Sequence, residues 1–149
     1  MNSSIEALAG VIQMAVAPVF LLTGIAGFLN VMSGRLSRII DRARIVERRM
    51  SAGIADEPRL SMTRIELRTL WRRVKLINWA IGMCTASGLM VCTVVVSLFV
   101  GDFWDLRLAE PIIVLFMLAL VLLIFALLLF IKEVHLATRL LHVGREFTD

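Results

Sequence analysis

Three long apolar segments constrain this chain more than any other feature of its sequence. They cover residues 5–32, 76–100 and 111–131. Each meets the length of about 20 apolar residues that an α-helix needs to cross a hydrocarbon core of about 30 Å. Backbone polar groups find no water inside a membrane, so such segments cross it as helices. The sequence therefore predicts an all-α integral membrane protein with three transmembrane helices.

The distribution of charge predicts the orientation of these helices. Between Ser33 and Asn78 there are twelve Lys or Arg residues against five Asp or Glu, whereas the loop 101–110 carries one Arg against three acids. Lys and Arg in short loops remain on the cytoplasmic side during insertion. The same bias accounts for most of the excess positive charge, so no nucleic-acid partner is expected. Trp79 and Trp104, about 37 Å apart along a helix, suit the two interfacial belts.

Six regions follow from these boundaries. We expect a first transmembrane helix at 1–32 with the N-terminus outside, a cytoplasmic helical hairpin at 33–78, a second transmembrane helix at 79–100, an external acidic loop at 101–110, a third transmembrane helix at 111–131, and a cytoplasmic helix or tail at 132–149.

The basic segment is patterned as two helical arms. In the first arm, apolar residues recur at alternating steps of three and four, namely Leu36, Ile39, Ala43, Val46 and Met50. After a break at 53–58, the spacing returns at Leu60, Thr63, Leu67, Leu70, Val74 and Ile77. This spacing is typical of coiled coils, and two such stripes predict an antiparallel hairpin. The second arm begins either at Pro58 or at a capping box formed by Thr63 and Glu66. Each arm is expected to continue the transmembrane helix beside it.

Arginine and lysine side chains lie on the outer faces of the arms. The simplest interpretation is a solvated surface that keeps the hairpin soluble. A more specific hypothesis is that the cations nearest the bilayer bind anionic lipid head groups, each contributing about 1 kcal/mol of binding free energy. These cations are Arg35, Arg38, Arg72, Arg73 and Lys75.

The first transmembrane segment has one small and polar side. Gln13, Thr23, Gly27 and Asn30 fall within an arc of roughly 160° on a helix. As a packing surface, this arc would meet the second helix or its own copy in a neighbouring subunit. As a pore lining, it would face water around a symmetry axis, and Phe20 or Val31 would form a constriction. One copy has too few helices to enclose a channel, so the pore hypothesis requires a homo-oligomer.

The second transmembrane segment carries a ridge of small residues at four-residue spacing, which predicts close helix packing. The ridge consists of Ala80, Cys84, Gly88 and Cys92.

Several functional classes are disfavoured by what the sequence lacks. Residues 7–32, 79–100 and 111–131 contain no Asp, Glu, Lys, Arg or His, which disfavours ion-coupled transport. Both cysteines lie inside the second span, and His135 and His142 lie beyond the third. No catalytic, cofactor or metal site is therefore expected, and the chain is not predicted to be an enzyme.

The run from Ala17 to Gly27, followed by the stretch from Asn30 to Arg42, resembles a bacterial family of small three-span membrane proteins classed as a domain of unknown function. The resemblance covers essentially the whole chain and implies a bacterial inner-membrane location. It implies no substrate or activity. From the residues themselves we expect a homo-oligomeric, channel-like assembly lined by the first helix. The alternative is a membrane-anchored scaffold or adaptor whose hairpin binds a cytoplasmic protein partner.

Overall fold

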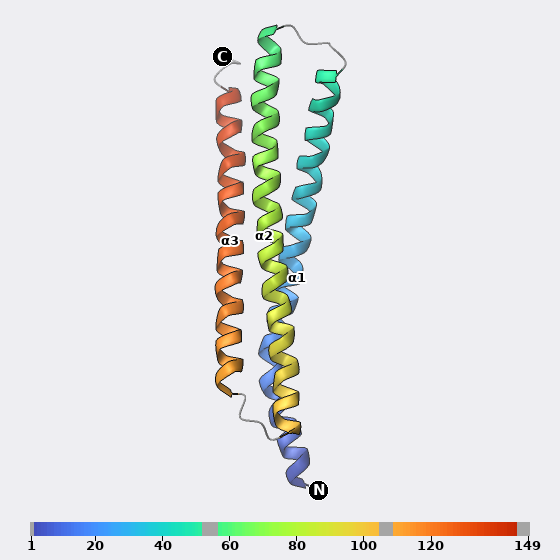
Figure 1. The fold of residues 1–149 in the computed structure, drawn as a ribbon, viewed down its shortest axis with the longest axis vertical. Coiled ribbons are helices and arrows are strands. Elements are labelled where there is room, and N and C mark those ends of the chain that lie inside the picture. The colour runs from blue at the N-terminus through green and yellow to red at the C-terminus, as the bar shows by residue number, and fades with distance from the viewer. Residues whose placement is uncertain (1, 52–56, 105–108, 146–149) are drawn as a thin grey trace. The chain divides into compact units, whose positions relative to one another are not determined.

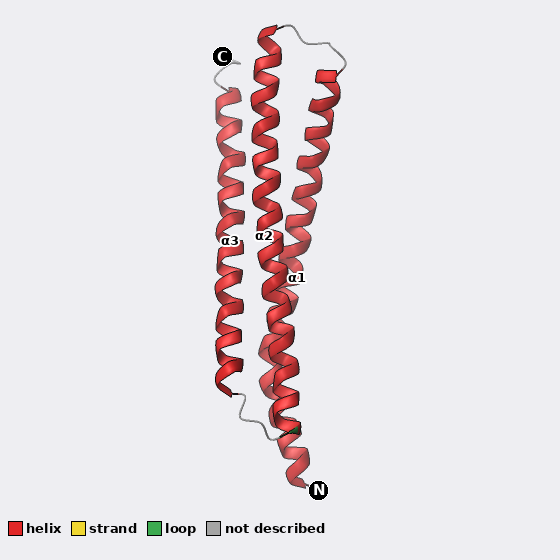
Figure 2. Cartoon of the chain, viewed as in Figure 1, coloured by secondary structure: helices red, strands yellow, loops and turns green. Residues whose placement is uncertain are grey.

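The computed structural model describes residues 2–51, 57–104 and 109–145, and its regular elements there are all α-helices (Figure 2). Helix α1 spans Asn2–Ser51, α2 spans Glu57–Phe103 and α3 spans Ala109–Arg145 (Figure 1). Each is long and apolar enough to cross a membrane. The predicted all-α fold with three such helices is confirmed. Residues 52–56 of the predicted turn, 105–108 of the predicted acidic loop and 146–149 of the predicted tail lie outside the described residues.

The first two helices run without interruption through an apolar segment and a basic one. Neither Pro nor Gly separates Arg35 from Ser51, which allows α1 to continue beyond its apolar part. Helix α2 begins at Glu57, so Pro58 lies in the first turn, where a missing N–H costs no intrahelical hydrogen bond. The alternative start at Thr63 is not observed. Helix α3 likewise begins two residues before Pro111 and extends well past the apolar segment.

The chain forms two compact units, and all three helices contribute to both. Unit 1 comprises Met1–Asn30 and Gly82–Ala126, and unit 2 comprises Val31–Ile81 and Leu127–Asp149.

One line of residues along α1 faces the interior of the chain over almost the whole helix. It runs from Val11 through Ile25, Met32 and Ile39 to Met50 in alternating steps of four and three residues, and every member is buried or half-buried. We call this the inner line. The pattern that the sequence displays between Leu36 and Met50 thus extends through the membrane segment as well. An apolar line with this spacing keeps one side of a long helix in contact with its neighbours.

In unit 1, α2 contacts both other helices. A Cβ atom added to Gly88 would lie 3.5 Å from Ile25 Cγ2 and 4.0 Å from Leu22 Cδ2, so α1 approaches α2 at this glycine. On the side toward α3, the buried Ser87 hydroxyl donates to the Ala119 carbonyl oxygen at 2.7 Å. Neighbouring residues of α2 therefore face different helices.

In unit 2, α1 and α2 run antiparallel. Arg42 of α1 pairs with Glu66 of α2, while Arg35 and Arg73 share a partner on α3. From Arg35 to Arg42, α1 advances by seven residues. Their neighbours on α2, Arg73 and Glu66, are also seven residues apart but come in the reverse order along the chain. The predicted coiled-coil hairpin itself stays a prediction.

Candidate functional site

The small and polar side of α1 faces away from the rest of the described chain. Seven exposed residues form an outer line on α1. They have the same alternating steps of four and three as the inner line. Each follows a residue of the inner line by two positions, which places it about 200° further around the helix. The outer line consists of Gln13, Ala17, Phe20, Gly24, Gly27, Val31 and Gly34. A Cβ added to Gly24, Gly27 or Gly34 would meet nothing within 4 Å. Helix α1 therefore has two opposite faces of similar spacing, of which only one is packed against the described residues.

The polar residues predicted to line a pore or an interface are all exposed on this side of α1. Thr23 lies beside the outer line, and its hydroxyl donates to the Val19 carbonyl oxygen of its own helix at 3.4 Å. Asn30 follows Thr23 by seven residues and is exposed as well. Packing of these side chains against α2 stays a prediction. Contact with a second copy remains a prediction.

The two amide side chains lie near opposite ends of the apolar segment. Gln13 and Asn30 are seventeen residues apart, or about 26 Å along a helix. If both side chains lie inside a hydrocarbon core of about 30 Å, each must lie close to one of its two boundaries. Between them, the outer line presents Ala17, Gly24 and Gly27 with the bulkier Phe20, whose exposed fraction is 74%.

The predicted ridge of small residues on α2 is packed over three of its four members. Ala80 and Cys84 are fully buried, and Gly88 meets α1. Cys92 is exposed within the described chain, and its part in helix packing stays a prediction. A four-residue step advances about 40° more than one turn, so three steps rotate the ridge by about 120°. The buried positions instead alternate steps of four and three, at Ala80, Cys84, Ser87, Val91 and Val94.

A buried carboxylate joins the three helices in unit 2. Glu133 of α3 is fully buried. Arg35 of α1 donates from Nε to Glu133 Oε2 at 3.2 Å, and its Nη2 lies 2.9 Å from the same oxygen. Arg73 of α2 donates to Oε1 from Nε at 3.0 Å and from Nη2 at 2.8 Å. The Arg35 guanidinium also lies 5.5 Å from the ring centroid of Phe130, within cation–π range.

The position of Glu133 follows from the periodicity of α3. Among the residues of α3 up to Ala137, Ala119, Ala126 and Glu133 are fully or almost fully buried, spaced seven apart on one face. The first two are small, whereas the third is a charged side chain directly after the apolar segment. Sequence reasoning missed this residue because it assigned 132–149 to a cytoplasmic helix or tail and gave Glu133 no role. An acid on the same heptad line as two alanines was the available signal.

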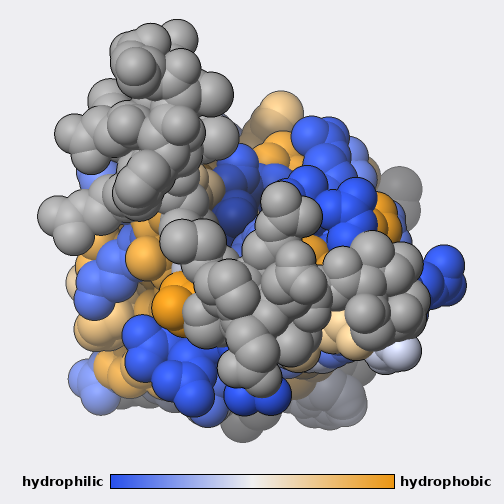
Figure 3. Space-filling model, turned by 90° about the horizontal axis from the view of Figure 1, so that it is seen from above, coloured by the Kyte–Doolittle hydropathy of each residue, from blue (hydrophilic) through white to orange (hydrophobic). Residues whose placement is uncertain are grey.

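The five cations predicted to bind lipid head groups divide into two sets. Arg35 and Arg73 are half-buried and hold Glu133. Arg38, Arg72 and Lys75 are exposed. Figure 3 shows that hydrophilic residues cover much of the described surface visible at the end of unit 2, with apolar residues between them. The second set is therefore the one available to an anionic ligand, and lipid binding stays a prediction.

Among the described residues, no three His, Cys, Asp or Glu side chains lie close enough together to hold a metal ion. His135 Nδ1 lies 3.1 Å from the Ile131 carbonyl oxygen of its own helix. The side chain of His142 lies outside the described residues.

These features define an all-helical protein with three candidate membrane-spanning helices and an ion-paired contact joining them in unit 2. The chain belongs to the family described as "Protein of unknown function (DUF2721)", whose model matches residues 15–143. The resemblance to a family of unknown function is thereby confirmed. No curated protein and no solved structure matches the chain. The family description names no activity, so the geometry has to support any functional proposal.

Proposed function

We propose that this chain forms a homo-oligomeric, channel-like assembly in which the outer line of α1 faces the symmetry axis. The observation that carries the proposal is the exposure of this face along a helix whose opposite face is packed. Apolar side chains are as stable against lipid tails as against another helix. A helix that faces lipid therefore needs neither glycines nor amides on its outer side. Their presence in a regular line favours contact with another copy or with water.

The assembly requires several copies because three helices enclose no channel. In a closed ring, each copy turns the same face of α1 toward the axis. Gln13, Thr23, Gly27 and Asn30 then line the path, and Phe20 or Val31 narrows it to an apolar constriction that opens by hydration. The positive-inside bias assigns unit 2 to the cytoplasmic side, and the bacterial inner membrane is the proposed location.

Disulfide cross-linking tests which face of α1 meets the axis. The experiment uses full-length protein in nanodiscs, in a C84A/C92A background, with a single new cysteine and an oxidant. Gly24→Cys lies on the outer line, and we expect covalent dimers. Ala26→Cys is the matched control, because Ala26 is also small and exposed but lies about 200° around the helix from Gly24. Cross-linking at Ala26 alone would overturn the proposed orientation.

Ion flux tests whether the assembly conducts. Phe20→Ala removes the bulkiest exposed side chain of the outer line, and we expect flux through proteoliposomes to rise. Asn30→Leu makes one end of the path apolar, and we expect flux to fall while assembly is retained. Loss of assembly in the Asn30 variant, with no flux from any form of the protein, would show that this face serves only packing.

A further inference from the structure

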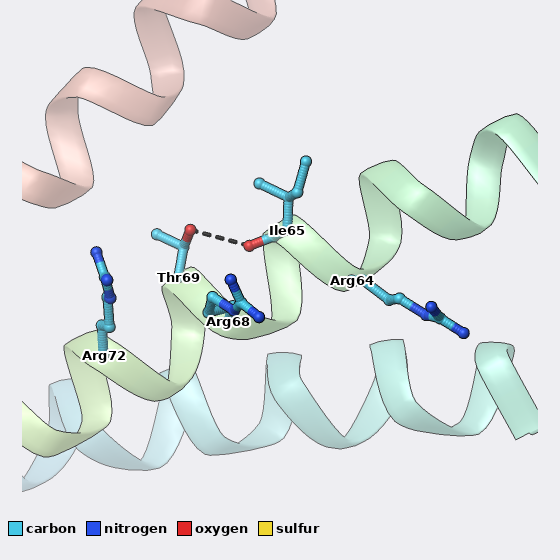
Figure 4. Close-up of a pocket in the computed structure, with 5 residues that line it drawn as sticks. All are labelled: Arg64, Ile65, Arg68, Thr69 and Arg72. Atoms are coloured by element: carbon cyan, nitrogen blue, oxygen red, sulfur yellow. Dashed lines mark hydrogen bonds between the residues drawn. The ribbon is translucent and has the colours of Figure 1, made fainter.

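Three arginines on α2 line an open hollow of about 370 Å³ in unit 2. Arg64, Arg68 and Arg72 follow one another at four-residue spacing, and Ile65 and Thr69 complete the lining (Figure 4). Figure 4 shows Ile65, Thr69 and Arg72 extending to one side of α2 and Arg64 to the other, with Arg68 between them. We call these five residues the basic groove.

The guanidinium groups of the basic groove are not neutralised within the described part of the chain. Other arginines of unit 2 have acids as partners: Arg42 pairs with Glu66, and Arg35 and Arg73 pair with Glu133. Among the residues whose side chains are described, none pairs with Arg64, Arg68 or Arg72, and all three are exposed. Within the described side chains, the groove therefore presents three positive charges without an acidic partner.

The groove also presents an apolar surface. The side chain of Ile65 is 68% exposed and lies among the arginines. The hydroxyl of Thr69 donates to the Ile65 carbonyl oxygen at 3.0 Å, so its donor is already used within the helix. A ligand that fits this surface combines negative charge with an apolar group.

Bilayer lipids reach only one end of the groove. Trp79, in the same unit and on the same helix, is exposed and suits the membrane interface. Arg72 is seven residues from Trp79, about 10 Å along the helix, whereas Arg64 is fifteen residues away, about 22 Å. At physiological salt the Debye length is about 8 Å, so Arg72 lies about one Debye length from the interface and Arg64 more than two. The full set of three charges therefore needs a ligand outside the bilayer.

We infer that the basic groove binds an acidic amphipathic helix of a protein partner. Carboxylates at four-residue spacing on such a helix repeat at about 6 Å, which matches the spacing of the three arginines. An apolar residue beside them would cover Ile65. This inference does not depend on the proposed channel, and it would give the chain the adaptor function that the sequence left open as an alternative.

The test uses full-length protein in phosphatidylcholine nanodiscs and a labelled synthetic peptide. The peptide is a helix of about four turns with glutamates at every fourth position and a row of leucines beside them. We expect it to bind the wild type, and R64Q/R68Q/R72Q to lower the affinity by about tenfold or more, equivalent to about 1.4 kcal/mol. The matched control is R44Q/R48Q/R49Q, which removes the same charge from exposed positions of α1 and should change the affinity less than about twofold. Helix content by circular dichroism establishes that both variants fold.

Three other results would contradict the binding of an acidic helix in the basic groove. Unchanged affinity after Ile65→Ser together with retained binding by R64Q/R68Q/R72Q would overturn it. Equal loss in the two triple variants would also overturn it, because the peptide would then respond only to net charge. Tighter binding of a 15-nucleotide single-stranded oligonucleotide at the same arginines would replace the protein partner by nucleic acid. None of these results bears on ion flux, so the inference and the proposed channel fail independently.

Discussion

Arg73 on α2 holds the buried carboxylate of Glu133 on α3 through two hydrogen bonds, of 3.0 Å from Nε and 2.8 Å from Nη2. Arg35 on α1 occupies the other carboxylate oxygen. One side chain of α3 therefore fixes the register of all three helices in unit 2. Burial makes this arrangement costly to disrupt, because a charge left without its partner has little water to solvate it.

Glu133→Gln should destabilise the protein by about 3–5 kcal/mol, toward the lower end because Arg35 is partly exposed. The matched control is Glu66→Gln, which breaks the exposed pair with Arg42 and should cost less than about 1 kcal/mol. Detergent-induced unfolding in mixed micelles, followed by circular dichroism, measures both. Equal losses in the two variants would show that the buried carboxylate has no special role.

Replacing all three charges together should be far less damaging than removing one. In R35M/R73M/E133L, apolar side chains occupy the contact and no unpaired charge remains. We expect stability within about 1 kcal/mol of the wild type, or above it. If the triple variant is as unstable as Glu133→Gln, apolar packing cannot replace the ion pairs, and the helices need these ionic hydrogen bonds.

Gly88→Leu should weaken the contact between α1 and α2 in unit 1. The added side chain would extend from a Cβ that is already 3.5 Å from Ile25, so we expect a loss of about 1–3 kcal/mol from overpacking. Gly82→Leu is the control, since a Cβ there meets nothing within 4 Å and the gain in helix propensity is the same. The same unfolding assay compares the two. If Gly82→Leu lowers the stability more than Gly88→Leu does, close packing at Gly88 is not what restricts the size of the side chain there.

Anionic lipid should be retained by Arg38, Arg72 and Lys75. Neutralising these three exposed cations should lower the affinity for phosphatidylglycerol by about 1 kcal/mol per cation while the fold stays intact. Native mass spectrometry, counting lipids that remain bound in mild detergent, provides the measurement. Unchanged retention would leave these residues as a solvated surface only.

The sequence predicts the helices well and the contacts between them poorly. Apolar length identifies three candidate spans, and the absence of breakers between Arg35 and Ser51 predicts a helix that continues past its apolar segment, as α1 does. These are local properties of the chain. The pairing of Glu133 depends instead on where Arg35 and Arg73 stand on two other helices, and the heptad line of α3 does not determine that register.

The surface of α2 illustrates the same limit on a smaller scale. A four-residue repeat predicts one packed ridge, whereas Ala80 and Cys84 are buried, Gly88 faces α1 and Cys92 is exposed, because such a repeat drifts around the helix. On α1, composition identified the side with Gln13 and Asn30 as special. The structure adds that this side is exposed among the described residues while the inner line is packed.

The number of subunits tests the proposed assembly most directly. Native mass spectrometry of protein released from nanodiscs gives this number without assuming an interface. We predict a closed ring of at least about four copies, enough helices to surround a water path along the outer line of α1. A stable monomer or dimer would contradict the proposed channel.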